Sequence, residues 1–190
     1  MLLTTDTAFD AHYPPVIRAH AFTHFTPVDV ARAAAAFLVK APGDHVLDVG
    51  SGAGKFCCVG ALTTTGHFTG VERRSALHAA AKAFAQQHDV ERVAFLLADV
   101  VTVDFSAYDA FFLFNPFFEN LGLDEPIDDG FVLERAAYDH YCAFTRAQLT
   151  AMPAGTRLAT YYSFLDDVPQ EAYRPLADSG VEKLRFWVRI

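Results

Sequence analysis

The sequence predicts an α/β fold, in which a doubly wound and mostly parallel sheet has a shortened C-terminal end. Short apolar segments of strand length alternate with amphipathic segments of helical length, which is typical of a parallel sheet. A glycine-rich loop also follows the first strand and precedes a helix. With 190 residues, of which 52% are hydrophobic, the chain is large enough for one domain with a buried core.

The first long helix is expected from Pro27 to Lys40. Thr26 is suited to the N-cap and Pro27 to the first helical position, where proline sacrifices no helical hydrogen bond. The apolar residues of this segment fall on one helical face, and "APGD" ends it. Four strands and one helix are expected next, in this order: strand 45–50, strand 67–72, the helix from Ser75 to His88, strand 92–99 and strand 108–115.

The C-terminal part begins with a looser acidic stretch, "ENLGLDEPIDDG". A helix from about Phe131 to Met152, a fifth strand in "GTRLATYYSF" and a short helix near Gln170–Ala177 are expected to follow. "KLRFWVRI" is expected to form one edge or inserted strand. Only residues 165–190 come after this fifth strand, so we expect a shortened C-terminal end.

The chain contains no internal repeat and no composition shift that marks a linker, so residues 26–190 are expected to form a single domain. Residues 1–25 are expected to form an N-terminal segment or lid that supplies part of the pocket. His12, Tyr13 and His24 are the candidates within it.

Composition excludes several classes of protein. A net charge of −8 argues against a broad electrostatic grip on nucleic acid. No apolar run is long enough to span a membrane, and the N-terminus lacks a signal-peptide pattern, so a cytoplasmic protein is expected. Three cysteines without a CxxC spacing fit a reducing compartment. His20 and His24 have the i, i+4 spacing of two ligands, but no third can be assigned, so we expect no metal site.

The loop "VLDVGSGAGKF" places glycines at positions 50, 52 and 54. It is not a P-loop, because Phe56 stands where a magnesium-binding Ser or Thr is needed. It departs from the dinucleotide fingerprint, because the third glycine comes one residue early. Asp48 at the strand end would repel a pyrophosphate and attract a cation, which makes a nicotinamide oxidoreductase a distant alternative.

This segment resembles the first motif of the class I S-adenosylmethionine-dependent methyltransferases, in which an acidic residue precedes G-x-G-x-G. The resemblance covers roughly residues 26 to 165, and "FTPVDVARAAAAFL" is loosely similar to the branch of Dot1-like and protein isoaspartyl methyltransferases. It implies S-adenosylmethionine as cofactor, with Asp48 near the methionine amino end, Glu72 on the ribose hydroxyls and Asp99 at the adenine amino group. The expected cofactor-binding residues are Asp48, Gly50, Ser51, Gly52, Gly54, Glu72, Arg73, Asp99, Val100 and Asn115.

"AFFLFNPFFEN" carries the candidate catalytic residues. Phe111–Phe114 are expected to belong to the buried strand. Asn115-Pro116-Phe117-Phe118 resembles the [DNS]-P-P-[YFW] motif of many N-methyltransferases, with phenylalanine in place of the second proline. The resemblance implies that Asn115 and the Pro116 carbonyl hold an amino group and that an aromatic residue, Phe117 or Phe118, packs on the substrate.

The sequence thus favours an S-adenosylmethionine-dependent methyltransferase that acts on a nitrogen of a small molecule or protein side chain. Two alternatives stay open: an RNA or DNA N-methyltransferase, and a non-catalytic cofactor-binding protein of the same fold. The expected ligands are S-adenosylmethionine and S-adenosylhomocysteine. Nucleic acid is less favoured as a partner, and no membrane partner is expected.

Overall fold

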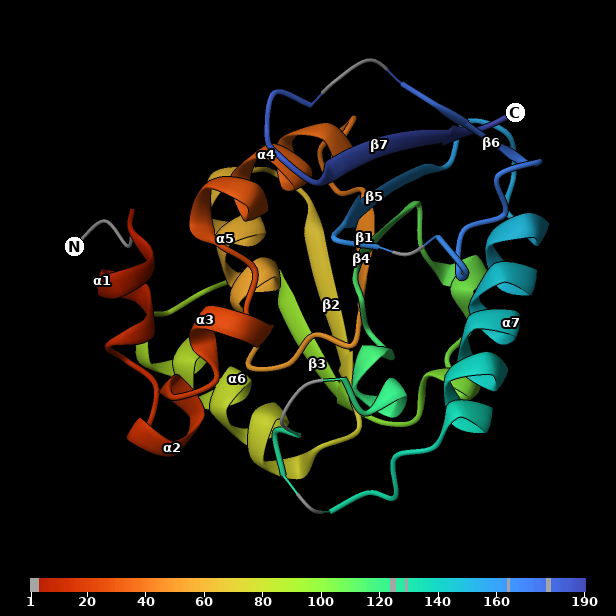
Figure 1. The fold of residues 1–190 in the computed structure, drawn as a ribbon. Helices are drawn as coiled ribbons and strands as arrows, with labels where there is room; N and C mark the ends of the chain where they lie inside the picture. Colours follow the sequence, from red (N-terminus) through yellow and green to blue (C-terminus); the bar gives the residue numbers. More distant parts are fainter. Residues whose placement is uncertain (1–3, 124–125, 129, 164, 177–178) are drawn as a thin grey trace.

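The computed structural model describes residues 4–123, 126–128, 130–163, 165–176 and 179–190. Its centre is a seven-stranded sheet with the strand order β3-β2-β1-β4-β5-β7-β6 (Figure 1). Strands β1 to β5 run parallel, and β7 pairs antiparallel with both β5 and β6. The strands are β1 (His45–Val49), β2 (His67–Glu72), β3 (Val93–Leu97), β4 (Ala110–Phe114), β5 (Arg157–Tyr161), β6 (Tyr173–Pro175) and β7 (Leu184–Arg189).

Helices cover both faces of the sheet. In Figure 1, α4 (Val28–Leu38), α5 (Lys55–Thr63) and α6 (Ser75–Gln87) lie on one side, and α7 (Arg135–Ala151) lies on the other. The chain reverses its direction of winding between β1 and β4, and ligands bind at such a switch point in open α/β sheets. The remaining helices are short: α1 (Asp6–Asp10), α2 (Pro15–Arg18), α3 (Ala21–His24), η1 (Val100–Thr102), η2 (Phe105–Ala107) and η3 (Phe118–Leu121).

Alternating side chains of β4 fill the two cores that the sheet separates. Phe112 belongs to the core under α4 and α5, whereas Phe111 and Leu113 belong to the core under α7. All three are fully buried, which confirms the prediction of a buried strand for Phe111–Leu113, whereas Phe114 ends the strand half-buried and lines the cavity described below. A strand covered on both faces is apolar at successive positions, and this is why "AFFLF" shows no polar alternation.

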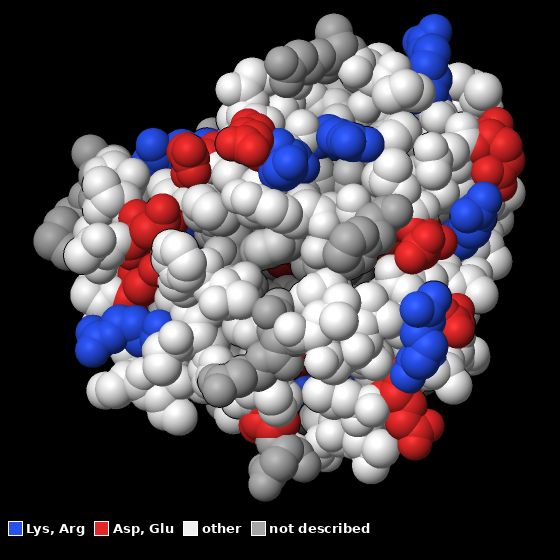
Figure 2. Space-filling view, viewed as in Figure 1, with Lys and Arg blue, Asp and Glu red and all other residues white. Residues whose placement is uncertain are grey.

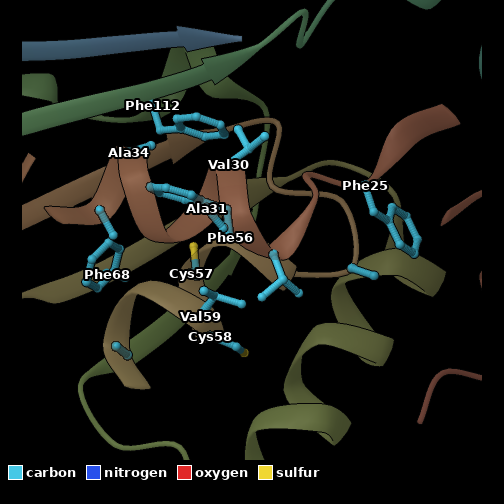
Figure 3. Close-up of a cluster of buried hydrophobic side chains, with 14 of the residues drawn as sticks. Phe25, Val30, Ala31, Ala34, Phe56, Cys57, Cys58, Val59, Phe68 and Phe112 are labelled. Atoms are coloured by element: carbon cyan, nitrogen blue, oxygen red, sulfur yellow. The ribbon is translucent and has the colours of Figure 1, made fainter. Parts of the chain in front are cut away.

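The core beneath α4 is built around Phe56 of α5. Its ring stacks on Phe112 with centroids 3.9 Å apart and meets the edge of Phe68 at 5.7 Å (Figure 3). Gly60, one turn farther along α5, has no room for a side chain, since a Cβ would lie 2.4 Å from the Phe68 ring. The helix therefore lies close against the sheet, and its first residues stay at the carboxyl edge of β1.

The N-terminal segment shares this core. Phe9, Tyr13 and Phe25 are buried in the same cluster as the residues of α4 and α5, and Phe9 stacks on Phe84 of α6 at 4.2 Å. Residues 5–25 thus form a packed wall beside the sheet, and their closing as a lid stays a prediction.

Most predicted elements agree with the structure to within a few residues, but three details are wrong. Thr26 does not cap α4, because Pro27 is the N-cap and the Val28 amide donates to Asp6 Oδ1 at 2.9 Å. The helix predicted from Phe131 begins at Arg135. The third wrong prediction is the short helix near Gln170–Ala177, which the structure does not contain at residues 170–176.

In place of that helix, residues 170–172 form a turn and Tyr173–Pro175 forms β6. The Pro169 carbonyl accepts the amides of Ala172 and Tyr173, and the buried Tyr173 hydroxyl donates to the Leu149 carbonyl at 3.2 Å. Ala177, where the predicted helix ended, lies outside the described residues. The sequence predicts that the last strand, β7, is either an edge strand or an inserted strand. It is inserted, because it lies between β5 and β6. No described residue between β5 and β6 is helical, so this connection is short.

No helix in the described part of the chain is long and apolar enough to cross a membrane.

The core around Phe56 predicts a large stability effect. Phe56→Ala removes a ring that is 2% exposed, so we expect a loss of about 3–5 kcal/mol in the free energy of unfolding, measured by urea denaturation. Phe22→Ala is the matched control, since Phe22 is fully exposed and should change the free energy of unfolding by less than about 0.5 kcal/mol. Equal effects of the two substitutions would contradict this packing.

Candidate functional site

A cavity of about 920 Å³ opens at the carboxyl ends of the parallel strands. This volume is at the upper end of the range of small-molecule sites, about 300–1,000 Å³. Its lining joins distant parts of the chain, among them Gly52, Glu72, Asp99, Asn115, Tyr141 and Tyr162. On the face shown in Figure 2, most charged side chains lie toward the periphery.

The structure brings most of the predicted site residues to this cavity. Those that line it are Gly50, Gly52, Glu72, Arg73, Asp99, Val100, Asn115, Pro116 and Phe117. Asp48 and Ser51 line a smaller pocket, which shares Gly50 and Lys55 with the large one. Gly54 lines neither pocket.

The three glycines of the loop have different structural roles. Gly50 has φ +74°, and a Cβ there would lie 2.9 Å from the Pro116 Cβ, so the loop crosses directly over the start of the Asn-Pro turn. Gly52 has φ +54°, and a Cβ there would meet only the Phe25 ring at 3.9 Å, which leaves the backbone open to a ligand. Gly54 packs inward, since its Cβ would lie 2.5 Å from the Phe95 ring.

Asp48 lies beneath the loop and is 4% exposed. Burial raises the pKa of its carboxyl to about 7, partly offset by the Cys57 thiol, which donates to Oδ2 at 3.5 Å. A nearby cation would favour the ionised carboxylate. The hydroxyl of Ser51, also in this small pocket, is buried and has no hydrogen-bond partner among the described residues.

Glu72 connects the end of β2 to the glycine loop. Its Oε2 accepts the Gly52 amide at 3.0 Å, and its Oε1 accepts the Arg74 amide at 2.8 Å. Burial raises the pKa of this carboxyl, and the hydrogen bonds and charge of Arg74 partly oppose that rise. The carboxylate is therefore held at the cavity wall by backbone donors of two segments.

Asp99 belongs to a network that sequence reasoning missed in part. Its Oδ1 accepts the Val101 amide at 3.1 Å, and its Oδ2 accepts the Tyr141 hydroxyl at 2.8 Å. Tyr141, on α7, stacks on Phe117 with ring centroids 5.2 Å apart and accepts a long hydrogen bond from Arg73. Tyr141 has no local sequence signal, because only the packing of α7 brings it to the site.

The N-terminal wall is tied to the glycine loop by a buried lysine. Lys55, the first residue of α5, is 3% exposed, and its Nζ lies 2.7 Å from both Asp6 Oδ1 and Asp10 Oδ1. The Tyr13 hydroxyl donates to the Ala53 carbonyl at 2.9 Å. Sequence reasoning did not find the carboxylate pair, since nothing near Asp6 or Asp10 indicates a partner 45 or more residues away.

The other two N-terminal candidates, His24 and His12, lie in different places. His24 lines both pockets. His12 lines neither and lies against His88, with ring centroids 4.3 Å apart. The rings of His20 and His24 are 6.0 Å apart, and the described residues contain no group of three or more side chains that could hold a metal ion.

Asn115 follows β4 in a left-handed conformation with φ +40°, and its carbonyl accepts the Phe118 amide at 3.1 Å. No hydrogen bond within the described residues holds its side-chain amide. Asn120 supports the turn, because its Nδ2 donates to the Phe117 carbonyl at 2.9 Å. Glu119, in the short helix after the turn, lies 2.8 Å from Arg74 Nη2 and accepts the Ile127 amide.

This set of side chains fits an adenosine with a cationic end better than a pyrophosphate. Gly52 offers an open backbone to the cavity, Glu72 and Asp99 offer carboxylate acceptors, and Phe117 and Tyr141 offer ring faces. The lysine nearest to the loop is neutralised by two carboxylates, so the site lacks the excess positive charge that a pyrophosphate needs.

Comparisons with solved structures agree with this fold. TrmN from Thermus thermophilus is similar with a TM-score of 0.63 and 21% identity, over 91% of this chain and 52% of that one. A methyltransferase from Geobacter sulfurreducens, in complex with S-adenosylhomocysteine, has a TM-score of 0.53 and 21% identity, over 77% and 54%. The [4+2]-cyclase SpnF has a TM-score of 0.54 and 20% identity, over 70% and 43%.

At these identities the likeness shows the fold alone, and the chain spans about half the length of these structures. A comparison with curated protein sequences gives no significant match. The sequence matches a protein family described as "Methyltransferase domain" over residues 40–175, which is more than half of the chain. The looser likeness to the Dot1-like branch stays a prediction. The chain therefore belongs to this methyltransferase-domain family, and its fold is that of the class I S-adenosylmethionine-dependent methyltransferases.

Proposed function

We propose that the protein transfers a methyl group from S-adenosylmethionine to a nitrogen of a small molecule or a protein side chain. The observation that carries this proposal is the position of Asn115. It follows β4 in a left-handed turn beside the glycine loop, and it lines the same cavity as Glu72 and Asp99. The acceptor motif and the cofactor motif thus meet in one cavity.

The residues that would hold the cofactor lie along the carboxyl edge of β1, β2 and β3. Glu72 would accept hydroxyl groups of the ribose, and Asp99 with Val100 would bind the adenine edge, where Phe117 and Tyr141 supply ring faces. Asp48, Ser51 and the open backbone of Gly52 would surround the methionine end. When bound, the cofactor supplies a methyl group on a positively charged sulfur.

The Asn115 side chain would orient the acceptor. Its amide oxygen is a hydrogen-bond acceptor for the N–H groups of an amine, which directs the nitrogen lone pair toward the methyl carbon. The Pro116 carbonyl follows directly and would be a second acceptor. Methyl transfer needs an in-line approach more than it needs a strong base, so orientation and exclusion of water account for most of the acceleration.

Size and charge support a small acceptor over a nucleic acid. The cavity has walls from the N-terminal segment, and two of its four lining cations, Lys55 and Arg74, are at ion-pair distance from carboxylates. The free thiols of Cys57, Cys58 and Cys142 also fit the reducing compartment that the sequence predicts.

Glu72 gives a direct test of the cofactor assignment. We expect Glu72→Ala to weaken S-adenosylhomocysteine binding at least tenfold in calorimetric titration, because charged hydrogen bonds contribute about 1.5–3 kcal/mol. Glu171→Ala is the matched control, since Glu171 is exposed and pairs with Arg146 far from the cavity. An unchanged dissociation constant for Glu72→Ala would count against the assignment.

Asn115 gives a test of catalysis. Asn115→Gly removes the amide and tolerates the left-handed conformation, so we expect a fall in methyl transfer of roughly 10²–10³-fold, with S-adenosylhomocysteine affinity preserved. The assay follows labelled methyl groups from S-adenosylmethionine into a panel of amines, into lysine- and glutamine-containing peptides, and into RNA.

Each outcome of that assay has a defined meaning. Labelled amines or peptides support the proposal, and labelled RNA favours the nucleic-acid alternative. No label in any acceptor, with the cofactor bound, favours a non-catalytic protein. Wild-type transfer by Asn115→Gly would contradict the role of the amide. Methyl transfer itself must be measured, since a [4+2]-cyclase is among the structures of similar fold.

A further inference from the structure

A second left-handed residue lies directly opposite Asn115. Phe114 and Tyr161 are register partners at the ends of the parallel strands β4 and β5, so Asn115 and Tyr162 follow them side by side. Tyr162 has φ +50°, and both residues line the cavity. A left-handed conformation is unusual for a bulky residue, and such strained positions gather at ligand sites.

Three rings meet at this point. Tyr161 lies between the other two, with ring centroids 4.8 Å from Phe114 and 4.8 Å from Tyr162, at interplanar angles of 61° and 85°. Phe114 and Tyr162 are 6.4 Å apart at 40°. The rings are thus mutually inclined and do not form two parallel faces. The rings pack against one another edge to face, and an aromatic ring face attracts a cation through its quadrupole.

Carboxylates act on the Tyr161 ring of this cluster. The pKa of the Tyr161 phenol is raised first by burial and then by Tyr162, and three carboxylates add to this rise. They belong to Asp29, to Glu182, which lies 3.8 Å from Lys183 Nζ, and to Asp6, which pairs with Lys55. A negative charge near the phenol disfavours a phenolate and, for the same reason, favours a cation.

No positive charge is part of the ring cluster. The Lys55 ammonium is shared by two carboxylates, those of Asp6 and Asp10, so the local balance of the three groups is negative. Arg18 lines the cavity from α2 and is exposed. The three rings themselves carry no charge at neutral pH, and they line the cavity together with Asn115.

We propose that the ring cluster of Phe114, Tyr161 and Tyr162 is the acceptor subsite and that it takes an aliphatic amine. This proposal rests on the proposed function. The amine binds as an ammonium ion, loses one proton to solvent, and directs its N–H groups to the Asn115 amide oxygen. Its lone pair forms the new N–C bond as the carbon–sulfur bond breaks. The positive charge thereby passes from sulfur to nitrogen, where the ring faces stabilise it.

The first test compares two probes that differ only in charge. Choline carries a quaternary nitrogen, like the charged product, and 3,3-dimethylbutan-1-ol is its neutral carbon isostere. We expect choline to bind the protein saturated with S-adenosylhomocysteine at least tenfold more tightly than the isostere, in calorimetric titration. Equal binding of the two probes, or tighter binding of the planar neutral ring of indole, would overturn the proposal.

Two variants test whether the Tyr162 ring causes the preference for choline over its isostere. Tyr162→Leu should remove the tenfold preference for choline, and Tyr162→Phe should keep it, with S-adenosylhomocysteine affinity unchanged in both. Tyr108→Leu, outside the cavity, is the matched control. A preference that survives in Tyr162→Leu would overturn the assignment.

The two proposals fail in different ways. The probe comparison is repeated on the free protein, so it gives a result even when S-adenosylhomocysteine does not bind. If the unaltered protein does not bind S-adenosylhomocysteine, the proposed function is wrong. If it binds S-adenosylhomocysteine but does not prefer choline to the isostere, the amine subsite is wrong.

Discussion

The close approach of Gly50 to Pro116 fixes how the two halves of the candidate site meet. A Cβ on Gly50 would lie 2.9 Å from the Pro116 Cβ, and φ at Gly50 is +74°, so both the space and the backbone demand glycine. The strands beneath, β1 and β4, are parallel neighbours at the switch point of the sheet. The glycine loop and the Asn-Pro turn therefore leave the sheet side by side, and every other part of the cavity is arranged around this contact.

Carboxylates connect the segments that surround the cavity. Glu72 binds the Gly52 amide from β2, and Asp99 binds the Tyr141 hydroxyl from α7. On the other side, Lys55 is held by Asp6 and Asp10 of α1. Buried charges of this kind are costly unless they are paired, so these contacts specify one arrangement of segments that are far apart in the sequence.

The sheet and the motif residues could be predicted from the sequence because their signals are local. Buried parallel strands are short apolar runs, and Asp48, Glu72 and Asp99 each stand within two residues of the end of one. The glycine spacing together with Asp48 was enough to separate a methyltransferase loop from phosphate-binding loops. The same local signal could not distinguish Gly54, which packs under Phe95, from Gly52, which faces the cavity.

Features that depend on tertiary contacts were either missed or predicted wrongly. The cap of α4 comes from Asp6, 22 residues away, and not from the adjacent Thr26. The segment after Gln170 has a helical composition, but pairing with β7 and burial of Tyr173 make it a turn and a strand. Tyr141 and Tyr162 reach the cavity only through the packing of α7 and the register of β4 with β5.

The geometry of the cavity above the glycine loop fits an adenosine with a methionine-derived end. Calorimetric titration of the intact protein with S-adenosylhomocysteine, with NADH in parallel, is the decisive measurement. We expect micromolar binding of S-adenosylhomocysteine and no binding of NADH. Binding of NADH without binding of S-adenosylhomocysteine would rule out this assignment, because Asp48 and the paired Lys55 should oppose a pyrophosphate.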